Sequence, residues 1–149
     1  MSLRRKAREL GLQVLFQWDI HGGTAGWMED FWEQNKTHPD ARAFADRLVH
    51  GVIEHAADLD VTIGKYAEHW TVARMAHIDR SVLRMAVFEF LYLEDIPARV
   101  TMNEAIEIVK VFGDEQSGAF VNGILDRILR EDPRLRDKAR ESVTPVAHD

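Results

Sequence analysis

The sequence predicts an all-α protein, a compact bundle of about seven helices around one core. Apolar residues recur every three or four positions through most of the chain, whereas alternating apolar and polar residues, which are typical of half-buried strands, are scarce. Glycine and proline separate the periodic stretches at Gly22-Gly23, Pro39, Pro97 and Gly113. A chain of 149 residues, 46% of them hydrophobic, can bury one core and leaves little room for a second substantial domain.

The N-terminal half is predicted to form three or four helices. The first ends near Gly22-Gly23, and one side of it carries Leu3, Ala7, Leu10, Val14 and Trp18. A short aromatic segment follows, with Trp27, Phe31 and Trp32. Pro39 fits the first turn of the next helix, whose apolar side carries Ala41, Ala45, Leu48 and Val52. Asp58 is a candidate N-cap for a further helix, and the alternative at this position is only a bend in a continuous one.

The next helix is predicted to be the central one. Asp79 is a candidate N-cap, and two adjacent rows of apolar residues follow it, with almost no purely polar face between them. The rows are Val82, Ala86 and Phe90, and Leu83, Val87 and Leu91. Such a helix lies either at the centre of a bundle or against a partner as well as the core.

Two further helices are predicted before the C-terminal tail. Thr101 and Glu104 have the spacing of a capping box at the start of the first, and Gly113 suits its end. The second is amphipathic and stops before Pro133; its apolar residues are Phe120, Val121, Ile124, Leu125, Ile128 and Leu129. We therefore expect a single domain over residues 1–132, and a charged, frayed tail over residues 133–149.

Composition excludes several classes of function. The chain has no cysteine, which rules out disulfides, thiol catalysis and cysteine-ligated metal sites. There is no Gly-rich phosphate loop, G-x-S-x-G or H-E-x-x-H motif, and Glu104 and Glu107 lack the Glu-x-x-His partners of a di-iron site. We expect no enzyme activity, no metal and no cofactor. The absence of a long apolar segment or signal peptide predicts a cytoplasmic protein.

The charge is distributed unevenly. The chain has 19 basic and 25 acidic residues, a formal charge of −6, but residues 1–8 contain Arg4, Arg5, Lys6 and Arg8 without an acid. On a helical wheel Arg4, Arg5 and Arg8 share one quadrant, which Leu12 and Phe16 extend. Arginines beside an exposed ring suit single-stranded RNA, whose phosphates pair with guanidinium groups and whose bases stack on rings. The alternative is a core Phe16 and a merely electrostatic patch.

Four blocks of sequence, in order, resemble the NusB family of transcription antitermination factors. They are residues 5–18, 78–86, 103–107 and 112–126. This resemblance implies an all-helical, non-catalytic domain that binds the boxA element of nascent RNA together with the ribosomal protein NusE. The pair then joins an RNA polymerase antitermination complex, chiefly in ribosomal RNA operons.

The resemblance also implies roles for individual residues. The RNA-binding positions fall on Arg4, Arg5, Lys6, Arg8, Phe16, Phe112 and Phe120. The NusE-binding positions fall on Asp79 and on the loop Asp114–Ser117, which includes Gln116. Three positions depart from the family pattern: Phe16 replaces a frequent Tyr, Gln116 a frequent acid, and Ala119 a frequent Lys. We expect Gln116 to alter the affinity for NusE, and Ala119 to remove one phosphate contact.

Two alternatives to this hypothesis stay open. The first is a protein-interaction or homodimerisation module without an RNA role; a homodimer that buried the first helix would also hide its arginines. The second is a detached RNA-binding domain related to that of RNA cytosine methyltransferases, in which the same fold occurs. Because the chain has no cysteine and ends where a catalytic domain would begin, we expect a free-standing NusB-like protein.

Overall fold

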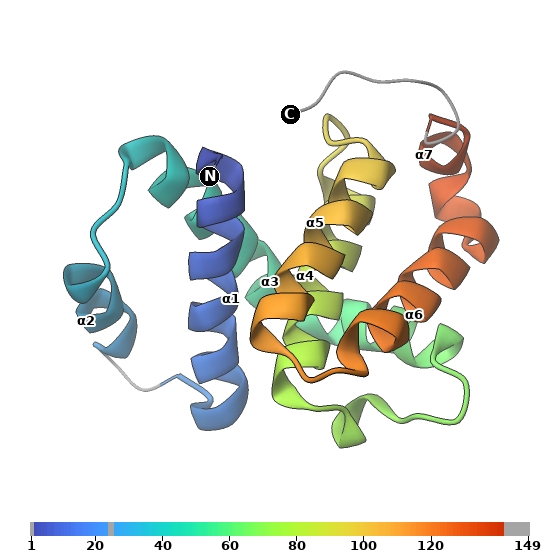
Figure 1. Ribbon diagram of the computed structural model, residues 1–149, viewed down its shortest axis with the longest axis horizontal. Coiled ribbons are helices and arrows are strands. Elements are labelled where there is room, and N and C mark those ends of the chain that lie inside the picture. The colour runs from blue at the N-terminus through green and yellow to red at the C-terminus, as the bar shows by residue number, and fades with distance from the viewer. Residues whose placement is uncertain (1, 24–25, 142–149) are drawn as a thin grey trace.

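The computed structural model describes residues 2–23 and 26–141, and its regular elements are all helical, as predicted. Figure 1 shows their arrangement. The elements are α1 (Leu3–His21), α2 (Trp27–Gln34), α3 (Pro39–Tyr66), the 3₁₀ helix η1 (Val72–Arg74), α4 (His77–Tyr92), α5 (Ala98–Phe112), α6 (Ser117–Glu131), the 3₁₀ helix η2 (Pro133–Leu135) and α7 (Arg136–Glu141). No helix in these ranges is long and apolar enough to cross a membrane.

Helix α4 is the centre of the bundle, as its double apolar rows predict. It packs against α1, α3, α5 and α6, and Figure 1 shows it behind α5. Every residue from Asp79 to Phe90 is buried, including charged ones. The consequence is that Arg80, Arg84 and Glu89 find their charged partners inside the protein.

Helix α3 is one continuous helix of 28 residues, which decides the alternative that the sequence left open at Asp58. The bend does not form because Leu59 and Ile63 continue the buried stripe of the preceding turns into the core. Pro39 occupies the first turn, as predicted, and the backbone N–H of Asp40 donates to Nδ1 of His38 at 3.0 Å.

Two predicted N-caps are wrong. Helix α4 begins at His77, so Asp79 lies within its first turn. Helix α5 begins at Ala98 after Pro97, so Thr101 lies inside the helix, where a capping box cannot form because its first residue must be outside the helix. The predicted helix ends are confirmed: Gly22 closes α1 with a left-handed backbone at φ 72°, and α5 stops at Phe112, before Gly113.

The segment that the sequence predicts to be frayed is folded as far as Glu141. Residues 133–141 form η2 and α7, with Leu135 buried in the core. The Lys138 ammonium donates to the backbone carbonyls of Glu89 at 2.8 Å and Leu93 at 2.7 Å. The ammonium is a second donor to these carbonyls, which also accept the backbone N–H of Leu93 and Ile96, and this contact of a cation with the C-terminal end of α4 fixes α7. The rest of the predicted tail, residues 142–149, lies outside the described residues.

Candidate RNA interface

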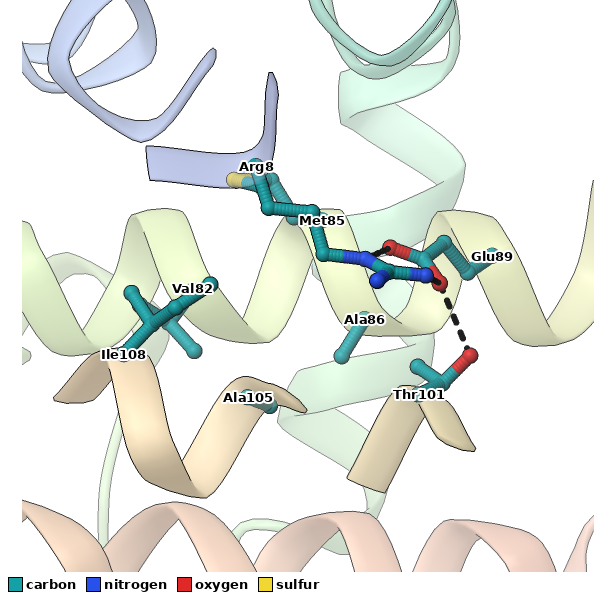
Figure 2. A pocket seen from close by; sticks show the side chains of 8 residues that line it. All are labelled: Arg8, Val82, Met85, Ala86, Glu89, Thr101, Ala105 and Ile108. Atoms are coloured by element: carbon teal, nitrogen blue, oxygen red, sulfur yellow. Dashed lines mark hydrogen bonds and ion pairs between the residues drawn. The ribbon is translucent and has the colours of Figure 1, made fainter. Parts of the chain in front are cut away.

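Arg8 lies in the core and not on the surface strip that the helical wheel predicts. Its side chain is 2% exposed, and its Nε and Nη2 donate to the two carboxylate oxygens of Glu89 on α4, each at 2.9 Å. The Thr101 hydroxyl, from α5, donates to the same carboxylate at 2.8 Å (Figure 2). The prediction of an exposed Arg8 is wrong because α1 is buried on two sides, by α3 and α4, and the quadrant of Arg8 and Leu12 faces inward.

The other three basic residues at the start of α1, Arg4, Arg5 and Lys6, lie at the surface and form what we call the tip. Arg4 places its guanidinium 4.7 Å from the centre of the Phe44 ring. Arg5 donates through Nε to Glu104 on α5, and this hydrogen bond and the nearby acids raise the pKa of Arg5 despite its partial burial. Lys6 is exposed. The tip therefore presents Arg4, Arg5 and Lys6 at the surface, and the Arg5 guanidinium is held by the Glu104 carboxylate.

Phe16 lies further along α1 and is half-buried, so it is neither a core residue nor a fully exposed one. Its ring meets the His77 ring edge to face, with 6.0 Å between the centroids and 82° between the planes. His77 is the first residue of α4. Phe16 thus lies at the surface where α1 meets the start of α4, with part of its ring accessible.

Three predicted partner-binding residues and one predicted RNA-binding residue, Phe120, converge on one hollow of about 330 Å³. Asp79, Asp114, Gln116 and Phe120 line it, although they come from α4, from the loop before α6 and from α6 itself. Phe112, which the sequence groups with them, is not among its lining residues and packs instead against the core. The structure therefore brings together four of the residues that the resemblance implies.

Four residues that line this hollow are missing from the sequence predictions. All four come from the segment between α3 and α4: Trp70, Arg74, Met75 and Ala76. The Trp70 side chain is half-exposed and meets Phe120 edge to face, with 5.6 Å between ring centroids. An exposed tryptophan in a hollow is typical of a protein-binding surface. The sequence does contain a signal for Trp70: it is a tryptophan in a polar segment without helical periodicity, so it does not belong to the apolar side of any predicted helix.

The acidic wall of the hollow is built from two differently placed carboxylates. Burial raises the pKa of Asp79, the Ser117 hydroxyl opposes this, and repulsion from Asp114 adds to it. Asp79 Oδ1 is buried without a hydrogen-bond partner among the described residues. Asp114 caps α6, because its Oδ1 accepts the backbone N–H of Gln116 at 2.8 Å and of Ser117 at 3.0 Å. The two carboxylates therefore bring negative charge to the hollow from different positions, Asp79 from a buried one and Asp114 from the loop before α6.

A buried ion cluster joins α1 to α4 between the tip and the hollow. Asp19 on α1 accepts from Arg80 Nη2 at 2.6 Å, from Arg84 Nη1 at 2.7 Å, and contacts His77 Nδ1 at 2.5 Å. Burial alone would raise the pKa of Asp19, but the hydrogen bonds from Arg80, His77 and Arg84 outweigh it and lower the pKa to about 2. The cluster fixes the face of α1 that carries Phe16.

We expect Asp19→Asn to lower the free energy of unfolding at neutral pH by about 2 kcal/mol. This is the free energy that corresponds to the lowering of the Asp19 pKa from 3.8 to about 2. The folded pKa lies below the unfolded value, so this contribution is complete above about pH 4 and is lost as the pH falls through about 2. Urea unfolding should show the gap to wild type narrowing between pH 5 and pH 2.5. Asp46→Asn, which removes an exposed pair with Arg42, is the control and should cost little. A difference in unfolding free energy between wild type and Asp19→Asn that does not change with pH would contradict the lowered pKa of Asp19.

The described residues contain no cluster of three or more potential metal ligands. Two histidines of the helices, His55 and His77, have ring or carboxylate partners. His55 stacks on Tyr92 with 4.2 Å between ring centroids, and His77 contacts Asp19. The geometry of the surface is therefore that of a binding site made of cations, rings and one acidic hollow.

Comparison with known proteins shows the family to which the chain belongs. The NusB family profile matches residues 5–130. The transcription antitermination protein NusB of Syntrophus aciditrophicus is 42% identical over 146 residues, which are 97% of this chain and 91% of that protein. The chain belongs to the NusB family. The residues that the family profile matches run from the first turn of α1 to the last turn of α6, so η2 and α7 lie beyond that profile.

Solved NusB structures have the same fold. A structure of T. maritima NusB matches with a TM-score of 0.76 and 38% identity over 88% of this chain and 92% of that one. A crystal structure of the antitermination factors NusB and NusE in complex with dsRNA matches with a TM-score of 0.78 and 30% identity, over 87% of this chain and 98% of that one. The all-helical NusB fold predicted from the four sequence blocks is confirmed.

Proposed function

We propose that this protein is a transcription antitermination factor that binds boxA RNA together with NusE. The complex would join RNA polymerase in the cytoplasm, chiefly at ribosomal RNA operons, and no step would be catalytic. One observation carries the proposal: a relative with the same fold over 98% of its length is found with NusE and RNA. The surface described above offers chemistry that suits both ligands.

The RNA side of the proposal rests on α1. Arg4, Arg5 and Lys6 provide positive charge for phosphates at one end of the helix. Phe16 provides a partly accessible ring for an unstacked base further along the helix. Arg8 has no part in this contact, because its guanidinium is committed to Glu89 in the core. The electrostatic contribution to RNA binding therefore comes from three cations at the start of α1 and not from the four that the sequence predicts.

The partner side rests on the hollow between α4, α6 and the segment before α4. Its carboxylates, Asp79 and Asp114, suit a basic segment of NusE, and Trp70 provides apolar contact area. Phe120, which the resemblance implies to bind RNA, lines the same hollow and would offer its ring where the two ligands meet. Neither surface alone is extensive. Two weak contacts on one RNA reinforce each other through effective concentration, which explains how a protein of net charge −6 would hold RNA selectively.

Replacing Arg4, Arg5 and Lys6 together with alanine is expected to weaken boxA binding and to flatten its salt dependence. Each lost phosphate contact with single-stranded RNA lowers the slope of log affinity against log salt by about 0.7, so the triple variant should lose up to about 2. Fluorescence anisotropy at several salt concentrations measures this slope. The control removes three exposed cations elsewhere, Lys36, Lys110 and Arg130. Equal slopes for the two triple variants would contradict the proposed site.

A further inference from the structure

His77 occupies the surface between the proposed base-stacking ring and the proposed partner hollow. Its ring meets Phe16 edge to face at 6.0 Å. It begins α4, and Ala76, directly before it in the chain, and Asp79, two positions after it, line the hollow. Its side chain is 46% exposed, so a ligand that reaches both Phe16 and the hollow passes over His77.

The buried ion cluster holds the His77 ring in one orientation. Nδ1 lies 2.5 Å from Asp19 Oδ2 and 3.0 Å from Arg80 Nη2. A carboxylate oxygen only accepts, and the shorter contact is the one to Asp19, so Nδ1 carries the proton and donates to Asp19. Arg80 Nη2 then donates to Asp19, at 2.6 Å.

This orientation fixes what the other ring nitrogen can do. With the proton on Nδ1, Nε2 of the neutral ring is a hydrogen-bond acceptor. No residue in the described ranges forms a hydrogen bond with Nε2. Asp19 and Phe16 already hold the His77 ring in the free protein. Binding of a ligand to Nε2 therefore loses little side-chain entropy at His77.

We propose that His77 is an RNA-contacting residue whose Nε2 accepts a hydrogen bond from the nucleotide beside the base on Phe16. The inference rests on the proposed function, because it places His77 within that RNA site. The donor is a ribose 2′-hydroxyl or an amino or imino N–H of a base, the neutral donors that an unstacked nucleotide presents. Asp19 is a positioning residue here, because it acts on the RNA through His77.

The test compares His77→Phe, which keeps a ring beside Phe16 but lacks Nε2, with wild type and with His50→Ala, the control at an exposed histidine of α3. Anisotropy titrations use boxA RNA with NusE present, after circular dichroism has shown equal helical content. We expect His77→Phe to weaken binding about three- to tenfold, the effect of one neutral hydrogen bond, and His50→Ala to bind as wild type does.

RNA with single 2′-deoxy substitutions identifies the donor. If one substitution weakens wild type but not His77→Phe, the donor is that 2′-hydroxyl. If every substitution affects the two proteins alike while His77→Phe remains weaker, the donor is an N–H of a base. Equal affinities of His77→Phe and wild type would overturn the inference while leaving RNA binding intact. Absence of RNA binding by wild type would instead overturn the proposed function.

Discussion

Arg8→Met is expected to lower the free energy of unfolding by about 3–5 kcal/mol, because it leaves the buried carboxylate of Glu89 without its counter-charge. Both side chains are 2% exposed, and two hydrogen bonds of 2.9 Å join them. The Thr101 hydroxyl would be the remaining side-chain donor to Glu89 among the described residues, and a neutral donor does not replace a guanidinium. Urea unfolding at pH 7 measures the loss.

The double variant Arg8→Met with Glu89→Met is the control for this prediction. It removes both charges and fills the same space with flexible apolar side chains, so it should recover most of the lost stability. At a temperature where Arg8→Met is folded, its RNA affinity should keep the wild-type salt slope. A stable Arg8→Met with a reduced salt slope would contradict the structural role and restore Arg8 to the RNA site.

Gly51→Ala is expected to destabilise the protein by about 2 kcal/mol or more, through overpacking where α3 crosses α4. A Cβ at position 51 would lie 2.1 Å from Phe88 Cζ and 2.3 Å from its Cε1. The Phe88 ring is 5% exposed and stacks on Tyr92 with 5.3 Å between centroids, so it has little room to move. The two helices would have to separate.

Gly64→Ala is the matched control, because Gly64 lies in the same helix. A Cβ there meets only Val72 Cγ2, at an ordinary 3.6 Å. This variant should gain about 0.5–1 kcal/mol, because alanine loses less backbone entropy than glycine in a helix. Thermal unfolding of both variants gives the comparison. A Gly51→Ala protein as stable as Gly64→Ala would contradict the close crossing of α3 and α4.

The sequence predicts the helices well because local signals define them. Pro39 and Gly22 each act through their own backbone geometry, and the double rows of α4 require burial wherever that helix lies. The two N-cap errors show the limit of local signals. Thr101 has the spacing of a cap, but its hydroxyl is used by Glu89, twelve positions away in the chain and on another helix.

The site could be predicted only in part, for the same reason. A helical wheel places Arg8 beside Arg4, but whether that quadrant is covered depends on α3 and α4, and the counter-charge of Arg8 lies 81 positions away. The hollow joins residues from three segments, and Trp70 enters it through a loop whose path no periodicity describes. Family resemblance supplied Asp79, Asp114, Gln116 and Phe120, and their convergence on one hollow supports that resemblance.

The central claim is selective binding of boxA RNA with the help of NusE. The most direct test is an anisotropy titration of a boxA-containing single-stranded RNA and a scrambled RNA of the same composition, with and without purified NusE, at two salt concentrations. We predict tighter binding of boxA than of the scrambled RNA, strengthened by NusE and weakened by salt. Equal binding of the two RNAs, or no binding of either with NusE present, would contradict the account.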